Sequence, residues 1–82
     1  MNESRPMKTI FKSEQILADL TRRIQSGEFG PKGEKIPSER DLGKQYGCSQ
    51  VTMNKITAMI VTQGILTRRQ GSGTYVAVHP KK

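Results

Sequence analysis

The chain has 82 residues, enough for one small domain with a single core, and its 33% apolar and 5% aromatic content means that this core must be mainly aliphatic. Cys48 is the only cysteine, which excludes an internal disulfide and a cysteine-rich zinc site. No apolar run approaches the roughly 20 residues that cross a membrane, and there is no signal-peptide core. We therefore expect a cytoplasmic domain without a membrane segment, metal ion or other cofactor.

Charge is distributed unevenly along the chain. Fourteen Lys and Arg residues against seven Asp and Glu residues give a net charge of +7. All seven acidic residues fall within the first 41 positions, and the six basic residues that follow have no acidic counterpart. A basic surplus confined to one half favours a surface that faces a polyanion such as nucleic acid. An anionic membrane is disfavoured, because no segment combines a basic face with a large apolar one.

The N-terminal part predicts an arm followed by a helix. Residues 1–9 are polar and include a proline, so we expect a flexible arm there and an ordered domain at 10–78. A helix is expected from about residue 12 or 13 to residue 26, because three apolar residues recur at steps of four: Ile16, Leu20 and Ile24. Arg22 and Arg23 lie outside this stripe, either as a solvated pair or as phosphate contacts.

The segment 27–35 predicts a loop. Its three glycines and one proline exclude regular structure. Phe29 is the one large side chain that can anchor this loop to the core, and a very short extra strand is expected near Ile36.

A short second helix is predicted after Pro37. Ser38 is its expected N-cap, and Gly47 ends it after roughly two turns. Gly43 lies inside this helix, where glycine costs about 1 kcal/mol relative to alanine. A close approach by a neighbouring helix would explain a glycine at that position.

A tight turn at 47–49 leads into a longer helix at 49–63. Ser49 has the hydroxyl needed to accept from the backbone N–H of Thr52 and so to cap this helix. One face of the helix is a stripe to be buried, whose members recur at three- and four-residue steps: Met53, Ile56, Thr57 and Ile60. A short helix, a tight Gly-containing turn and a longer helix with a polar start are typical of a helix-turn-helix.

The other face of the helix 49–63 is polar and carries no acid. Its first two turns present amides, a hydroxyl, a small aliphatic group and one cation: Gln50, Val51, Thr52, Asn54 and Lys55. Such groups hydrogen-bond base edges, contact thymine methyl groups and pair with phosphate. The pattern thus predicts a recognition helix that lies in a DNA groove; the alternative is an ordinary amphipathic helix with a solvated face.

Two short runs rich in β-branched and aromatic residues, 65–69 and 74–78, predict a β-hairpin with its tip at 70–73. Arg68 and Arg69 beside the tip favour a basic wing that contacts phosphate over a hairpin that only covers the core. The predicted fold is mainly α with a small β-hairpin, that is, a winged helix-turn-helix of three helices and a two-stranded wing.

The run from Ile36 to Ala77 resembles the winged-helix domain of the GntR family of bacterial transcription regulators. The matching parts are PSERDL at the second helix, YGCS at the turn, QGIL before the wing and RRQGSGTYV in the wing. The resemblance implies that Arg40 clamps phosphate or base, that the first turn of the recognition helix reads bases, and that the wing tip enters the minor groove. The residues in the last two roles are Ser49, Gln50, Thr52, Asn54, Gly71, Ser72 and Gly73.

The sequence departs from this family where Gln50 and Asn54 stand, since arginine is common at both positions. Arginine is the usual reader of guanine, whereas Gln and Asn prefer adenine, so we expect a different operator. Family members normally continue into a C-terminal domain that binds a small-molecule effector and forms a homodimer on a near-palindromic operator. Because the chain stops just past the wing, residues 79–82 are interpreted as a tail or as the start of a linker to that absent domain.

The function that these observations favour is sequence-specific binding of double-stranded DNA, as the reader head of a metabolite-responsive repressor or activator. The candidate DNA-binding residues are Arg40, Ser49, Gln50, Thr52, Asn54, Lys55, Arg68, Arg69, Gly71, Ser72 and Gly73. The alternative is a winged-helix module for protein–protein docking whose basic surface is incidental. An enzyme is disfavoured, because the sequence offers no paired-carboxylate site, no nucleophile with its base and no metal cluster.

Overall fold

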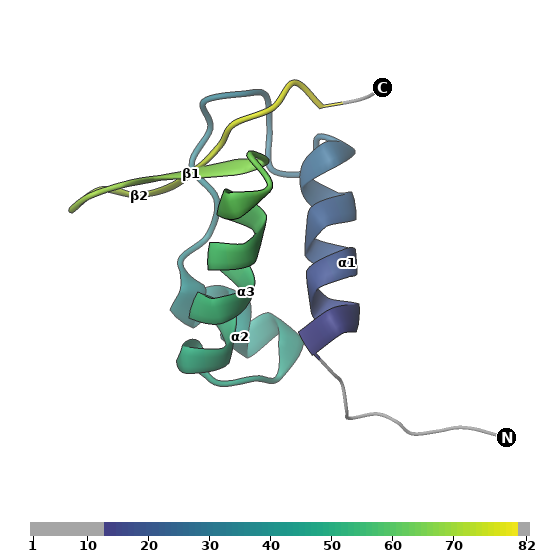
Figure 1. The fold of residues 1–82 in the computed structure, drawn as a ribbon, viewed down its shortest axis with the longest axis vertical. Coiled ribbons are helices and arrows are strands. Elements are labelled where there is room, and N and C mark those ends of the chain that lie inside the picture. Colours follow the sequence, from purple (N-terminus) through teal and green to yellow (C-terminus); the bar gives the residue numbers. More distant parts are fainter. Residues whose placement is uncertain (1–12, 81–82) are drawn as a thin grey trace, which may run out of the picture.

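Three helices and a two-stranded hairpin make up the fold in the computed structural model, which describes residues 13–80 (Figure 1). The helices are α1 (Ser13–Gln25), α2 (Glu39–Tyr46) and α3 (Gln50–Thr62), and the strands are β1 (Leu66–Arg69) and β2 (Gly73–Val76). This arrangement confirms the predicted winged helix-turn-helix. The predicted arm at 1–9 and the start of the domain at residue 10 lie outside the described residues.

Helices α1 and α2 and strand β1 all pack against helix α3. In Figure 1 it stands beside α1, with α2 at the end where α3 begins and the hairpin extending from the other end, away from α1. The four residues of its predicted stripe are all buried. Met53, Ile56 and Ile60 share one apolar core with side chains from the remaining elements and from the loop before α2: Leu20, Ile24, Ile36, Leu42, Leu66 and Val76.

Two serine caps fix where α2 and α3 begin. The Ser38 hydroxyl accepts from the backbone N–H of Asp41 at 3.1 Å, and the Ser49 hydroxyl accepts from that of Thr52 at 3.1 Å. Both serines have extended backbones, as N-caps require. Between the caps, Gly47 ends α2 in the left-handed conformation with φ 71°. The predicted caps and the predicted end of α2 are therefore confirmed.

Gly43 is buried where the turn between α2 and α3 comes back across α2. The N–H of Cys48 donates to the Gly43 carbonyl at 2.9 Å. A Cβ atom on Gly43 would lie 2.8 Å from the carbonyl oxygen of Cys48. The close approach that the sequence predicts is thus present, but the backbone of the turn makes it instead of a neighbouring helix.

The wing is a hairpin with a third segment attached to it. Strands β1 and β2 pair antiparallel from Leu66 opposite Val76 to Arg69 opposite Gly73. The expected extra strand near Ile36 is a single antiparallel bridge between Lys35 and Tyr75, supported by the bond from the Ile36 N–H to the Thr74 carbonyl at 3.0 Å. Each strand is four residues long, one residue shorter than expected.

Arg23 has a structural role that differs from both alternatives left open by the sequence, a solvated pair with Arg22 or a phosphate contact. Its guanidinium donates to the Tyr46 hydroxyl at 2.8 Å and to Glu28 at 2.9 Å, and it lies over the Phe29 ring at 4.8 Å. The Tyr46 hydroxyl in turn donates to Asp19 at 2.6 Å. This bond lowers the pKa of Asp19 below its ordinary 3.8, while burial raises the pKa of Tyr46. Arg23 therefore ties α1, α2 and the Phe29 loop together.

We expect Gly43→Ala to lower the free energy of unfolding by about 1–3 kcal/mol, because the added methyl group overlaps the Cys48 carbonyl oxygen. Alanine is the better helix former, so propensity alone predicts the opposite sign. Urea denaturation followed by circular dichroism measures the change. Lys44→Ala, at the exposed neighbouring position, is the control and should stay within about 0.5 kcal/mol of the parent. Unchanged or raised stability of Gly43→Ala would contradict the tight contact.

Tyr46→Phe should destabilise the domain by about 1 kcal/mol near neutral pH, since Asp19 and Arg23 both lose a partner. Because the folded-state pKa of Asp19 is depressed, this stabilisation is present above its ordinary value of 3.8 and is lost as pH falls through the lowered pKa. Urea denaturation at neutral and at strongly acidic pH should show the difference shrinking. Tyr75→Phe, whose hydroxyl pairs with Ser72, is the control and should show no such shrinkage. A pH-independent loss in Tyr46→Phe would contradict the coupling.

Candidate nucleic-acid interface

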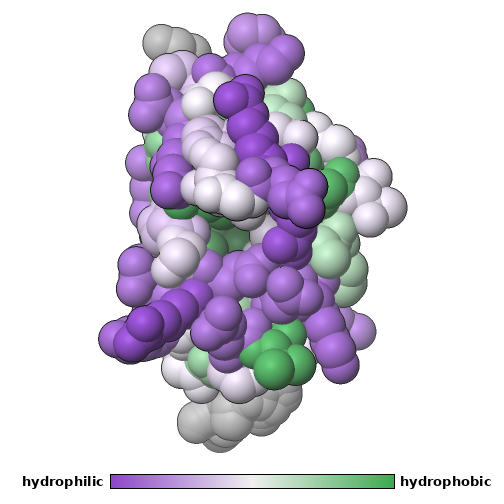
Figure 2. Space-filling view, turned by 90° about the vertical axis from the view of Figure 1, so that its left-hand side faces the viewer, coloured by the Kyte–Doolittle hydropathy of each residue, from purple (hydrophilic) through white to green (hydrophobic). Residues whose placement is uncertain are grey.

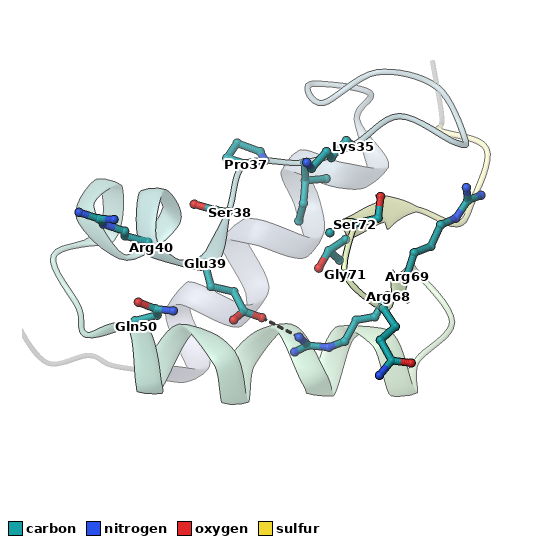
Figure 3. Close-up of a pocket in the computed structure, with 14 residues that line it drawn as sticks. Lys35, Pro37, Ser38, Glu39, Arg40, Gln50, Arg68, Arg69, Gly71 and Ser72 are labelled. Carbon is teal, nitrogen blue, oxygen red and sulfur yellow. Dashed lines mark ion pairs between the residues drawn. The ribbon is translucent and has the colours of Figure 1, made fainter.

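A groove lies between the N-terminal end of α2, the first residue of α3 and the tip of the wing. Figure 3 shows Arg40 and Gln50 at one end of this groove, Lys35, Ser72 and Arg69 at the other, and Glu39 in between. The residues that line it are 35–40, Gln50 and 68–74. The groove therefore joins three parts of the chain that the sequence keeps apart.

The first two turns of α3 place the predicted reading residues on the surface. Gln50, Val51, Asn54 and Lys55 are exposed, while Thr52 is half-buried. The hydroxyls of Ser49 and Thr52 are 3.0 Å apart and hydrogen-bond to each other. These two side chains are therefore engaged in holding the start of the helix, and the outward-facing amides belong to Gln50 and Asn54.

Glu39 was not among the predicted site residues, yet it connects two of them. Its Oε1 accepts from the Asn54 Nδ2 at 3.1 Å, and its Oε2 lies 2.9 Å from the Arg68 Nη1 as an ion pair. Arg68 also donates from Nη2 to the backbone carbonyl of Asn54 at 3.2 Å. We refer to Glu39, Asn54 and Arg68 as the acid-centred triad. It joins α2, α3 and β1.

The wing tip brings Gly71, Ser72 and Gly73 to one edge of the groove. Gly71 and Gly73 have φ of 76° and 141°, which only glycine adopts readily, so the predicted glycine tip is a tight turn. The Ser72 hydroxyl pairs with the Tyr75 hydroxyl, and the Arg69 guanidinium lies 4.7 Å from the centre of the Tyr75 ring. These contacts hold the serine and the arginine on the hairpin surface.

Lys35 is a second groove residue that the sequence analysis missed. A Cβ atom on Gly73 would lie 2.6 Å from the Lys35 Cε, so the lysine stem crosses the wing where the glycine leaves room. The bridge between Lys35 and Tyr75 is what brings it there. The sequence predicts a short extra strand near Ile36 but not the strand with which it pairs. It therefore does not indicate that Lys35 reaches the wing.

Three cations that line the groove, and one exposed cation on α3, have no acidic partner within residues 13–80. Within residues 13–80, no ion pair is formed by Lys35, Arg40, Lys55 or Arg69. Arg68, by contrast, is paired with Glu39. The face toward which the wing points in Figure 1 is covered mainly by hydrophilic side chains (Figure 2). Such a surface suits a partner with repeated negative charges.

No helix among the residues that the structure describes is long and apolar enough to cross a membrane.

Comparison with known proteins gives a consistent result. Residues 12–76 match the sequence profile described as bacterial regulatory proteins, gntR family. The chain is 38% identical over 64 residues to the histidine utilization repressor of Klebsiella aerogenes, covering 78% of this chain and 26% of that protein. It is 36% identical over 63 residues to the transcriptional repressor NagR of Bacillus subtilis, covering 77% of this chain and 26% of that protein. The chain thus spans about a quarter of the length of these relatives.

The fold has a counterpart among solved structures. The crystal structure of AraR(DBD) in complex with operator ORE1 superposes with a TM-score of 0.74 at 35% sequence identity. The similarity covers 88% of this chain and 90% of that chain, so it extends over helices and wing alike.

Proposed function

Because the chain belongs to the gntR family of bacterial regulatory proteins, we propose that it binds double-stranded DNA sequence-specifically, as the reader head of a transcription regulator. The observation that carries the proposal is the groove beside α3: three of its lining cations, Lys35, Arg40 and Arg69, are unpaired within residues 13–80, and the exposed start of α3 presents the amides of Gln50 and Asn54. AraR(DBD), similar over nearly its whole length, forms a complex with operator DNA, which supports the same use of the fold here.

In this proposal α3 lies in the major groove, which is wide enough to admit one α-helix, and the wing tip reaches the adjacent minor groove. Gln50 and Asn54 are one helical turn apart and both exposed, so they face neighbouring bases. Each amide can pair with N7 and N6 of adenine. Val51, also exposed, is the group suited to a thymine methyl.

We assign the contacts with DNA phosphates to Lys35, Arg40, Lys55 and Arg69. Each of these side chains is exposed, and a cation at the surface releases counterions when it meets DNA. Arg68 was predicted to act with them. We assign it a smaller share of phosphate binding, because Glu39 already matches its charge.

We further propose that two such heads act together on a near-palindromic operator in the cytoplasm. A homodimer would set the spacing of the half-sites. Its dimerising part, which also takes a small-molecule effector, would lie in sequence outside these residues. Support comes from family membership and from longer relatives that are named as repressors, of which the matched part is 26%.

The 82-residue chain should bind duplex DNA with strong salt dependence. With four phosphate contacts, the slope of log K against log salt should be about −3 to −4. Fluorescence anisotropy with a labelled mixed-sequence duplex between about 50 and about 300 mM salt measures this slope. A single strand of the same composition is the control and should bind more weakly. A slope near zero would contradict the proposed function and favour a docking module.

We expect base recognition to depend on α3 and sequence-independent phosphate binding to depend on the wing. On a site selected from random duplexes, Asn54→Ala should relax the preference at one or two A·T positions and leave the affinity for scrambled DNA nearly intact. Arg69→Ala should weaken binding to all sequences and flatten the salt slope by about one. Arg22→Ala, a cation on α1 that does not line the groove, is the control and should change neither. Equal, uniform losses in Asn54→Ala and Arg69→Ala would contradict the division.

A further inference from the structure

Of the described residues that line the groove, Glu39 alone is acidic, and its side chain is only 17% exposed. A carboxylate at a DNA-facing surface repels phosphate, so its presence there calls for a compensating role. Figure 3 shows it between α2 and α3, with its carboxylate directed to Arg68. The contacts of both of its oxygens indicate what that role is.

The Glu39 carboxylate fixes the orientation of the Asn54 side-chain amide. A carboxylate only accepts hydrogen bonds, so it must face the Nδ2 of Asn54 and not the Oδ1. The bond of 3.1 Å uses one of the two N–H groups on Nδ2. One N–H and Oδ1 remain, and these are the donor and acceptor that adenine N7 and N6 require. The triad therefore presents Asn54 in the form that suits an adenine.

Arg68 compensates the charge of Glu39. Its Nη1 lies 2.9 Å from the Glu39 Oε2, and its Nη2 donates to the Asn54 backbone carbonyl at 3.2 Å. The acid-centred triad thus has one negative and one positive charge, and it adds no net repulsion to the groove. Gln50 offers a contrast, because its side chain makes no hydrogen bond with any residue of 13–80 and must be ordered when DNA binds.

We propose that Glu39 is a positioning residue for sequence reading: it holds the Asn54 amide in the adenine-recognising orientation, while Arg68 cancels its charge. The inference rests on the proposed DNA binding and adds the residue that sets its specificity. Discrimination at the base pair opposite Asn54 should accordingly exceed that opposite Gln50.

The test compares base preference in variants of the 82-residue chain, using a site that the parent chain selects from random duplexes. Asn54→Ala should lose at least about fivefold discrimination at its A·T position. Glu39→Ala should lose the same preference at the same position, yet bind scrambled duplexes at least as tightly as the parent, because a negative charge has gone. The double variant should lose no more than Asn54→Ala alone, since the two residues act as one unit.

Two further variants separate positioning from charge. Glu39→Gln keeps an oxygen that can accept from the Asn54 Nδ2, so it should recover part of the preference lost in Glu39→Ala. Asp41→Ala removes an equal charge from the same helical turn at an exposed position, and it should keep the preference while binding all duplexes at least as tightly. Thermal unfolding checks each fold. If Glu39→Ala does not fold, Glu39→Met replaces it, because it keeps the side-chain length without the acceptor.

Failure of the proposed role of Glu39 can be distinguished from failure of DNA binding. Parental preference in Glu39→Ala, or an unchanged preference in Asn54→Ala, would overturn the inference while leaving DNA binding intact. Equal loss in Glu39→Ala and Asp41→Ala would also overturn it, because charge alone would then account for the effect. Failure of the parent chain to bind any duplex would instead overturn the proposed function.

Discussion

Burial of one face of α3 is the constraint on which the rest of the structure depends. A helix of 13 residues is marginal in isolation, so α3 owes its stability to the packing of Met53, Ile56 and Ile60. Contacts with α1, α2 and β1 accompany the burial of that face. The opposite side of its first two turns stays exposed, even though Glu39 and Arg68 bond to Asn54 there. The exposure of Gln50 and Asn54 therefore follows from the same packing that forms the core.

The sequence could predict those features that depend on residues near each other along the chain. The four-residue spacing of α1, the buried stripe of α3 and the caps at Ser38 and Ser49 all involve neighbours within one or two helical turns, where geometry is regular. The paired wing with its glycine tip belongs to the same class. The DNA contacts assigned to these elements from sequence stay predictions.

The missed features all join residues that are distant in sequence. Glu39 reaches Asn54 across 15 positions, and Arg23 reaches Tyr46 across 23. No periodicity specifies such pairs, because they depend on how whole elements are oriented. The uneven charge along the chain was informative but incomplete for the same reason. Lys35, Glu39 and Arg40 come from the half that holds every acid, yet folding brings them to the groove beside the basic wing.

The acid-centred triad also bears on how a domain of this kind changes its target during evolution. The Gln50 side chain makes no hydrogen bond with any residue of 13–80, so one substitution can exchange its base preference without breaking such a bond. Position 54 is different, because a new side chain there leaves a largely buried carboxylate facing it and an arginine bound to its backbone. We therefore expect lineages to explore new operators one residue at a time at position 50, and at position 54 only by correlated changes with positions 39 and 68.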